Sequence, residues 1–504
     1  MTSGTPSVSE WFHGRNVFIT GGTGFMGKVL IYKLLVSCHD LGNIFLLIRR
    51  KKEVDPRTRL QLMIQQEPFK AIKEKCPEQL KKIILIPGDT SASDLGLSTA
   101  DKERILQEVS VVFHMAANVK FDLTLKEAVN INTLGTMNVL NLAKQMPNLQ
   151  SFIHVSTTYC HCTEQVLEER GYQCSIKPEV VIETVNNLSS EVLNVMTPKI
   201  LEGQPNTYAF SKALSEDLIQ RCGLPVGVVR PSIVVASWKE PAVGWIENMN
   251  GPTGLMVGAG KGVIRTVLCN YDYLLNVIPC DMAINATIAL AWKVGLEKPA
   301  EPMFMNVTND SENPLSWGFA VDTGKKHATT HPFTGVLWYP GGSVTTIKLY
   351  HLIRVVLFHF LPAYVLDTLF VLTGNKPFLV RVQQKVSAGI DLVKYYTTKQ
   401  WDFRNDRMKA LELELNPSDR AEFFMDTTTI SWDDYILKYI LGTRKYCLKD
   451  DPSTLPRARK VLRYLYIADC FVKFTFAIFF IWFIYNWLTP YKEISTTVFD
   501  VHEI

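Results

Sequence analysis

Short apolar runs alternate with segments of helical periodicity through the first half of the 504-residue chain. This alternation predicts a parallel β-sheet that carries helices on both faces. The fold class that we predict is α/β, a doubly wound parallel sheet of the Rossmann type. We expect helices at residues 25–36, 124–145 and 207–221, and strands at residues 16–20, 43–48, 82–88, 111–114, 151–156 and 225–230.

The second half of the chain changes character twice. Gly, Pro and Trp become frequent in residues 237–266, and loops of this composition often line a substrate site. After a predicted linker at residues 327–342, the pattern becomes mostly helical. We therefore expect a first domain at residues 12–345, which includes the loops, and a smaller C-terminal helical domain at residues 349–447.

A terminal membrane helix is predicted from an apolar run near the end of the sequence. Residues 474–491 contain no charged side chain, and at about 1.5 Å per residue they extend roughly 27 Å, enough for a thin bilayer. We expect a membrane-anchor segment at residues 465–491. The alternative is a helix that packs on the helical domain or lies in the membrane plane. The cytosolic flank would be the basic residues Arg457, Arg459, Lys460 and Arg463.

Residues 349–372 form a second apolar segment. It is interrupted by His351, Arg354, His359 and Pro362, which argues against a second membrane span. The segment either rests on a bilayer, covers a substrate tunnel or forms a buried core helix. The buried helix is the interpretation that we favour.

Charge and cysteine usage exclude several classes of partner. The net charge of +4 is small for this length and comes without a dense basic stripe, so we expect no nucleic-acid partner. Residues 1–10 lack the apolar stretch of a secretory signal, so the cysteines should be free thiols in a reducing compartment. Cys160 and Cys162 flank His161 without a second pair of ligands nearby, and we expect no metal.

A glycine-rich turn follows the first predicted strand and opens a helix. Gly21 permits a tight turn, Gly24 lets the backbone approach a pyrophosphate, and Gly27 lets the helix pack closely on the strand. The free N–H groups of the helix N-terminus favour phosphate. The motif predicts a dinucleotide site formed by Thr20, Gly21, Gly24, Phe25, Met26 and Gly27.

Basic residues end the second predicted strand. Arg49 and Arg50 stand where an NAD-specific site usually has an acidic residue, and cations suit the 2′-phosphate of NADPH. Ordinary surface charge is the alternative interpretation. Asp89, after the third strand, is placed to contact the adenine, and Ala116, after the fourth, leaves room for the cofactor to pass.

Candidate catalytic residues occur in two places. Tyr208 and Lys212 are four positions apart at the start of a predicted helix, so they share one face. An ammonium near a phenol favours the phenolate, so we expect a lowered pKa for Tyr208 and proton exchange with a substrate oxygen. Thr157, at the end of the fifth strand, is the candidate donor to that oxygen, with Ser156 and Thr158 as alternatives.

Two sets of motifs carry a family resemblance. TGGTGFMG, HMAANVKFD, NINTLGT, HVSTTY, YAFSK and VVRPSIV, in this order, resemble the extended short-chain dehydrogenases over residues 12–325. The segment PNTYAFSKALSE, the loop at residues 232–262 and the terminal WDDYILKYILGTRKY resemble eukaryotic alcohol-forming fatty acyl-CoA reductases. This narrower resemblance covers nearly the whole chain.

The resemblance implies an NADPH-dependent enzyme that reduces long-chain fatty acyl-CoA to fatty alcohol and releases coenzyme A. It implies that Thr157 and Tyr208 polarise the carbonyl, and that Lys212 tunes Tyr208 and holds the nicotinamide ribose. Asn132 and Pro231 are carried over as parts of the cofactor site. Relatives are tail-anchored in the peroxisomal membrane with the catalytic domain facing the cytosol, and the endoplasmic reticulum membrane is the alternative location.

Two rival functions are compatible with parts of the pattern. A membrane-bound extended dehydrogenase acting on a sterol shares the glycine turn and the Tyr-Lys pair, but the C-terminal helical domain argues against it. A catalytically silent NADPH-binding scaffold on an organelle surface is the other alternative. The presence of Thr157, Tyr208 and Lys212 argues against a silent protein.

Overall fold

The central feature of the molecule is a parallel sheet of seven strands in the order β11-β7-β5-β4-β1-β2-β3. The structure, a computed structural model, describes residues 4–309 and 311–488. The order reverses next to β1, so an open crevice is expected where β1 and β4 end. The predicted fold class is confirmed. The strands are β1 (Asn16–Thr20), β2 (Ile44–Ile48), β3 (Ile83–Pro87), β4 (Val109–His114), β5 (Ser151–Val155), β7 (Val226–Pro231) and β11 (Met303–Val307).

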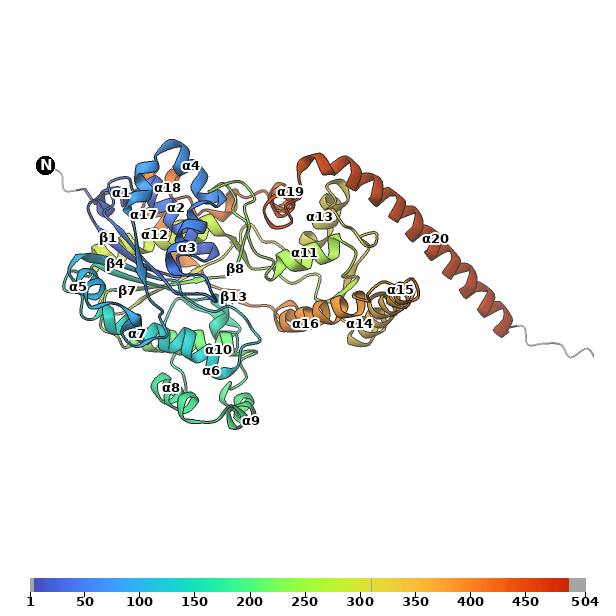
Figure 1. Cartoon of the computed structure of the whole chain (residues 1–504), viewed down its shortest axis with the longest axis horizontal. Helices are drawn as coiled ribbons and strands as arrows, with labels where there is room; N and C mark the ends of the chain where they lie inside the picture. The colour runs from blue at the N-terminus through green and yellow to red at the C-terminus, as the bar shows by residue number, and fades with distance from the viewer. Residues whose placement is uncertain (1–3, 310, 489–504) are drawn as a thin grey trace, which may run out of the picture.

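Helices cover both faces of the sheet, as Figure 1 shows. Val17 and Ile19 face α2 (Phe25–Ser37) and α12 (Cys280–Glu297), whereas Phe18 between them joins the opposite core. This alternation follows from the two-residue period of a strand. The opposite face is covered by α5 (Thr99–Glu108), α7 (Gly135–Ala143) and α10 (Thr207–Gln220).

The helix predicted at residues 124–145 contains a π-helical turn. It comprises α6 (Leu125–Ala128), a π-helix at Val129–Leu134, and α7. Such turns insert one extra residue per turn and are frequent at functional sites. Asn132 lies in this turn, and the turn packs on α10.

Shorter elements complete the first 345 residues. The predicted linker starts too early, because α13 continues to Thr330. The helices are α1 (Val8–Phe12), α3 (Pro56–Ile64), α4 (Glu67–Lys75), α8 (Pro178–Asn187), α9 (Ser190–Ile200), α11 (Pro252–Gly260) and α13 (Trp317–Thr330). The strands are β6 (Val166–Leu167), β8 (Ile233–Val235), β9 (Thr266–Leu268), β10 (Val277–Pro279) and β12 (Ser343–Thr345).

The C-terminal part is mostly helical and is tied to the sheet domain at two places. Trp432 and Ile440 join the same core as α2 and α12, and the short strand β13 (Asp402–Phe403) pairs with β6. The division into domains at residues 345 and 447 stays a prediction. The helices are α14 (Lys348–Val355), α15 (Leu361–Leu372), α16 (Leu379–Thr397), α17 (Asp406–Glu414), α18 (Pro417–Glu422), α19 (Trp432–Gly442) and α20 (Leu455–Leu488).

Two helical segments are long and apolar enough to cross a membrane, residues 348–372 and 452–488. Length and composition alone are weak support for membrane association, because a core helix of a soluble protein passes the same test. Most side chains of both segments are exposed, however. The favoured interpretation of residues 349–372 as a buried core helix is therefore wrong. Residues 489–491 of the predicted anchor lie outside the described residues.

Candidate active site

The glycine turn lies against the end of β4. Gly21 has φ +76°, and a Cβ there would lie 2.6 Å from the amide nitrogen of Ala116. A Cβ on Gly27 would lie 2.4 Å from the carbonyl oxygen of Gly21, so helix and turn pack closely. Gly24 begins α2 without a side-chain cap. The free N–H groups of this helix N-terminus fit the pyrophosphate of a dinucleotide.

Thr20 is in the turn but is fully buried. Its hydroxyl hydrogen-bonds His114 Nδ1 at 2.7 Å and accepts from the amide of Ala116 at 3.3 Å. Burial lowers the pKa of His114 to about 3, so the imidazole is neutral and suited to this bond. The hydroxyl thus connects the end of β1 to the end of β4 and to Ala116 just beyond it.

Three arginines gather beside the glycine turn. Arg49 Nη1 lies 3.7 Å from Asp89 Oδ2, and Arg50 lies 3.8 Å from Glu53, with both arginines substantially exposed. Arg59 of α3 was missed by the sequence analysis. It donates to the Arg49 carbonyl oxygen at 2.5 Å and to Thr23 Oγ1 at 2.9 Å. It belongs to the helix after the strand, and only the packing of that helix brings its side chain to the glycine turn.

The start of α10 carries the Tyr-Lys pair to the end of β5. Lys212 Nζ donates to the Val155 carbonyl oxygen at 2.7 Å and lies 3.0 Å from His154 Nε2. Tyr208 precedes Lys212 by one helical turn on the same face. Thr157 follows Val155 by two residues, so the three predicted catalytic residues belong to one corner where α10 meets the end of β5.

The hydroxyls at the end of β5 differ in their partners. Thr157 Oγ1 accepts from the amide of Tyr159 at 3.2 Å, which leaves its own proton for donation. Ser156 Oγ lies 3.7 Å from Cys160 Sγ, to which it donates, and Thr158 is fully buried. These contacts favour Thr157 among the three candidates.

The expected depression of the Tyr208 pKa is wrong in this structure. Burial, and to a smaller degree Cys160, raises the pKa of the Tyr208 hydroxyl. The Lys212 ammonium makes its hydrogen bonds to His154 and Val155 instead, and burial lowers its pKa to about 8. A protonated phenol is the form that a proton donor requires, so the raised pKa suits reduction of a carbonyl.

Asn132 and Pro231 occupy supporting positions. The Asn132 side chain donates to Ser211 Oγ at 2.9 Å and accepts from the amide of Asn118 at 2.8 Å, so it links α10 to the segment after β4. Its hydrogen bonds run to these groups rather than to Lys212. Pro231 is buried at the end of β7, where the chain turns toward β8.

A buried ionic cluster beneath the catalytic corner was missed. Arg230 donates to both carboxylate oxygens of Glu216, at 3.0 and 2.6 Å, and His161 Nε2 lies 3.0 Å from the same carboxylate. Burial alone would raise the pKa of Glu216, but Arg230 and His161 hold it well below its usual value. Cys160, His161 and Glu216 have metal-ligand spacing, yet Arg230 already supplies the compensating charge.

The helical part contributes an aromatic wall to the site. Asn206, whose side chain caps α10, donates to the Tyr396 hydroxyl at 2.9 Å. The ring of Phe121 lies between Tyr208 and Tyr396, with centroids 5.7 and 5.4 Å away. Tyr396 at the end of α16 therefore closes one side of the corner that holds Tyr208.

The Gly- and Trp-rich loop predicted to line the substrate site packs on the glycine turn. Trp245 stacks on Phe25 with centroids 5.0 Å apart, and Glu247 pairs with Lys28 at 2.5 Å. Both partners lie in the first two turns of α2. Met26 beside them is half-buried.

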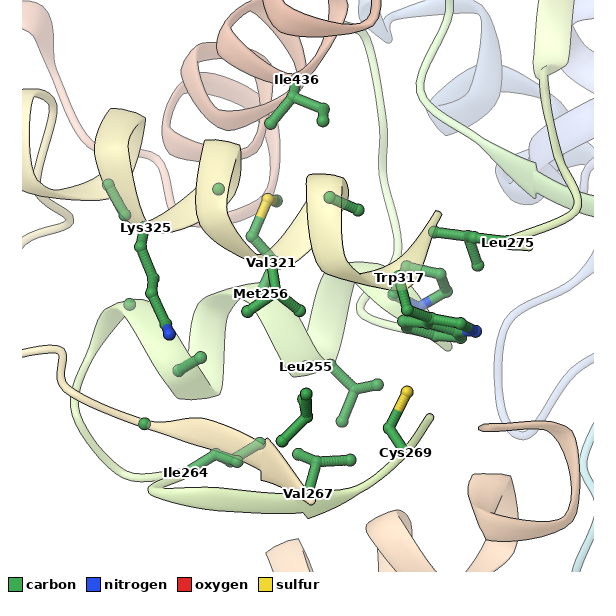
Figure 2. Close-up of a pocket in the computed structure, with 18 of the residues that line it drawn as sticks. Leu255, Met256, Ile264, Val267, Cys269, Leu275, Trp317, Val321, Lys325 and Ile436 are labelled. Carbon is green, nitrogen blue, oxygen red and sulfur yellow. The ribbon is translucent and has the colours of Figure 1, made fainter. Parts of the chain in front are cut away.

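Residues at the C-terminal end of this loop line an apolar cavity of about 180 Å³. Figure 2 shows Leu255 and Met256 of α11 and Val321 of α13 directed into it, with Val267 of β9 on a further side. It is lined almost entirely by carbon atoms. Other lining residues include Val235, Cys269, Leu275, Trp317, Ile436 and Tyr439.

The glycine turn, the cations and the Tyr-Lys pair on this sheet define the class of protein, a reductase that binds a nicotinamide dinucleotide. Two family models described as male sterility protein match residues 19–287 and 358–450. Fatty acyl-CoA reductase 1 of Rattus norvegicus is 37% identical, covering 91% of this chain and 90% of that protein. Fatty acyl-CoA reductase wat of Drosophila melanogaster is 35% identical, covering 90% and 88%. The chain belongs to the fatty acyl-CoA reductase family.

Solved structures support the fold. The reductase domain of a non-ribosomal peptide synthetase from Mycobacterium tuberculosis is 17% identical, with a TM-score of 0.57 over 87% of this chain and 93% of that chain. The terminal R domain of the myxalamid pathway is 16% identical, with a TM-score of 0.55 over 86% and 90%. At this identity the likeness shows a shared fold, which includes helical segments beyond the sheet.

Proposed function

We propose that this protein reduces long-chain fatty acyl-CoA to fatty alcohol with NADPH and releases coenzyme A. The observation that carries the proposal is the bond from Lys212 to Val155 at the end of β5, two residues before Thr157, with Tyr208 one helical turn before Lys212 on α10. The printed names of its relatives supply the acyl-CoA class. In balance, one acyl-CoA, two NADPH and two protons give one alcohol, one coenzyme A thiol and two NADP⁺.

Residues of the chain would donate hydrogen bonds and a proton to the substrate oxygen in both reductions. NADPH, when bound, supplies the hydride. Thr157 donates a hydrogen bond to the thioester carbonyl, and Tyr208 gives its proton to the oxygen as negative charge develops. The C–S bond of the hemithioacetal then breaks as its hydroxyl proton returns to Tyr208, and the leaving thiolate takes a proton from water, which yields aldehyde and thiol. The same hydroxyls serve the aldehyde. Lys212, hydrogen-bonded to Val155, is proposed to fix α10 and to stabilise, through its positive charge, the phenolate that Tyr208 becomes.

The proposal of NADPH rather than NADH rests on charge. The nicotinamide dinucleotide belongs to the class of the fold, whereas the 2′-phosphate preference is inferred from Arg49, Arg50 and Arg59. Arg59 is anchored to the glycine turn through Thr23. A guanidinium fixed beside the adenosine ribose favours a phosphate over a hydroxyl. Asp89, which pairs with Arg49, is proposed to lie beside the adenine.

The apolar cavity is proposed to hold the end of the acyl chain. Val235 of β8 lines it, and β8 follows directly on Pro231 at the cofactor edge. A long alkyl chain gains about 0.8 kcal/mol per methylene that leaves water. The cavity walls carry the carbon surface that such a chain needs.

We propose that α20 anchors the protein in the peroxisomal membrane as a tail anchor, with the catalytic domain facing the cytosol. The exposed apolar side chains from Phe474 to Leu488 and the basic residues before them support this arrangement. The resemblance to tail-anchored relatives supports the organelle, and the endoplasmic reticulum is the alternative.

The proposed activity is tested with the purified full chain, NADPH and either palmitoyl-CoA or a 3-ketosteroid. Palmitoyl-CoA should consume NADPH and release free thiol and hexadecanol. Turnover of the ketosteroid alone would favour a sterol dehydrogenase. NADPH binding without turnover of either substrate would favour a silent scaffold.

A further inference from the structure

Residues 348–372 form a continuous helix whose apolar side chains face outward. The segment comprises α14, a π-helix at Val356–Phe360, and α15. Leu349 is 68% exposed and Leu372 is 77% exposed. The other exposed apolar side chains are Tyr350, Leu352, Ile353, Val356, Leu357, Phe358, Leu361, Tyr364, Val365, Leu366, Leu369 and Val371.

This surface is far more apolar than water tolerates without a partner. Burying the apolar side chain of a leucine or valine is favourable because it removes apolar surface from water. Contiguous apolar patches of this kind mark interaction or membrane surfaces. The helix therefore needs an occupant for its outer face.

A single residue, Arg265, ties this helix to the middle of α20. The Arg265 amide donates to His359 Nε2 at 2.8 Å, and its carbonyl oxygen accepts from Arg354 at 3.0 Å. The Arg265 guanidinium lies 3.5 Å from Asp469 of α20, which also accepts from the Trp338 indole at 2.7 Å. Figure 1 shows α14, α15 and α20 on the side of the molecule far from β1. The Arg265 contacts thus connect the exposed helix to α20.

Polar groups of the hairpin formed by α15 and α16 favour the headgroup region over a full span of the bilayer. Asp367 accepts from the amides of Phe378, Leu379 and Val380, each at 2.9 Å, and so caps α16. The returning α16 carries charged and amide side chains and packs on β9. The turn between α15 and α16 and the charged side chains of α16 suit the headgroup region of a bilayer. An amphipathic helix there lies in the membrane plane.

The charges that flank the apolar face are mostly basic. Residues 348–385 contain the single acidic residue Asp367, against the basic residues Lys348, Arg354, Lys376, Arg381 and Lys385. Basic residues beside an apolar face favour the anionic surface of a cytoplasmic leaflet. This charge pattern distinguishes a bilayer from a neutral protein groove as the occupant.

We propose that residues 348–378 are a second bilayer contact, which lies in the headgroup region beside the point where α20 enters the membrane. The contact would hold the catalytic body against the membrane surface in one orientation instead of leaving it on a flexible tether. The proposal goes beyond the enzymatic activity and rests on the proposed anchoring of α20 in the membrane.

The test places the photoreactive residue p-benzoylphenylalanine at position 357 of the full chain. The protein is reconstituted in vesicles of phosphatidylcholine and phosphatidylserine, irradiated and analysed by mass spectrometry. A matched variant carries the same residue at position 413, because Leu413 of α17 is 73% exposed but lies on the catalytic body. Lipid adducts at position 357 and none at 413 are expected.

Other outcomes would overturn the proposal. Adducts between position 357 and peptides of a second copy would identify self-association as the occupant. The absence of lipid adducts at 357 would exclude a bilayer contact. A full membrane span is tested separately with a membrane-impermeant amine reagent added outside the vesicles. Lys376 should react, whereas its protection would contradict placement in the headgroup region.

Discussion

The proposed catalytic corner and the helix at residues 348–372 place their side chains in opposite ways. At the corner, Lys212 and Glu216 are buried, and each has partners within the chain. On the helix, Leu349 and Leu372 are exposed without comparable cover in the described structure. Buried charge is stable only with partners, and exposed apolar surface only with an occupant. The corner is therefore complete within the fold, whereas the helix indicates something outside it.

This difference predicts two separable sets of substitutions. Changes at the corner should alter chemistry or cofactor choice without altering lipid contact. Changes on the exposed helix should alter lipid contact without altering the chemistry of a bound substrate. Each variant should therefore be measured for both its activity and its lipid adduct at position 357.

The largest effect is expected from Tyr208→Phe. Loss of the proton donor should lower the rate of alcohol formation by about 10²–10⁴-fold, while NADPH affinity stays near that of the unsubstituted protein. Steady-state product formation and cofactor titration measure the two quantities. Tyr395→Phe is the matched control, because its hydroxyl donates to the Cys162 carbonyl oxygen in the neighbouring aromatic cluster. A Tyr208→Phe variant with an unchanged rate would refute the proton-donor role.

A smaller effect is expected from Arg59→Ala. Loss of a charged hydrogen-bond donor removes about 1.5–3 kcal/mol, so NADPH affinity should fall roughly 10- to 100-fold. NADH affinity should change much less, because NADH lacks the 2′-phosphate. Binding isotherms for both cofactors check the difference, with Arg57→Ala on the same helix as control. Equal losses for the two cofactors would show that Arg59 is only structural.

The alkaline pH dependence should follow Lys212. Its pKa lies at about 8 because burial disfavours the ammonium, so the group is charged below this pH and loses its proton above it. The Tyr208 hydroxyl stays protonated over this range. We expect kcat/KM to fall about tenfold per pH unit above pH 8. A kcat/KM that stays constant through pH 10 would show that catalysis does not need the positive charge of Lys212.

The mildest effect is expected from Val321→Trp in the apolar cavity. The larger side chain should fill space proposed for the end of the acyl chain. The ratio of kcat/KM for long over short acyl-CoA should fall, while the rate with the shortest substrate changes little. Phe319→Trp is the control, because Phe319 is an exposed residue of the same helix. An unchanged ratio would place the acyl chain elsewhere.

The sheet domain could be predicted because its signals are local. The apolar runs marked β1 to β5 within one or two residues, and the context of strand and helix identified Gly21, Gly24 and Gly27. Arg59 was missed because only the packing of α3 brings it to Thr23. The direction of the Tyr208 pKa was wrong because burial depends on the whole fold.

The exposed helix shows the same limit from the other side. Composition identified residues 349–372 as apolar. An apolar sequence has the same composition whether the helix is buried in a protein core or in a membrane. The structure separates these cases through the exposed side chains and the Arg265 contacts. The burial of an apolar helix is a tertiary property, which its own sequence does not encode.

The most direct test of the proposed chemistry follows the hydrogen atoms. The full chain is supplied with palmitoyl-CoA and NADPH that carries deuterium at both C4 positions of the nicotinamide. We expect hexadecanol with two deuterium atoms on C1 and one coenzyme A thiol for each alcohol. Alcohol without deuterium, or a singly labelled aldehyde as the only product, would contradict a double reduction at the corner of Tyr208, Lys212 and Thr157.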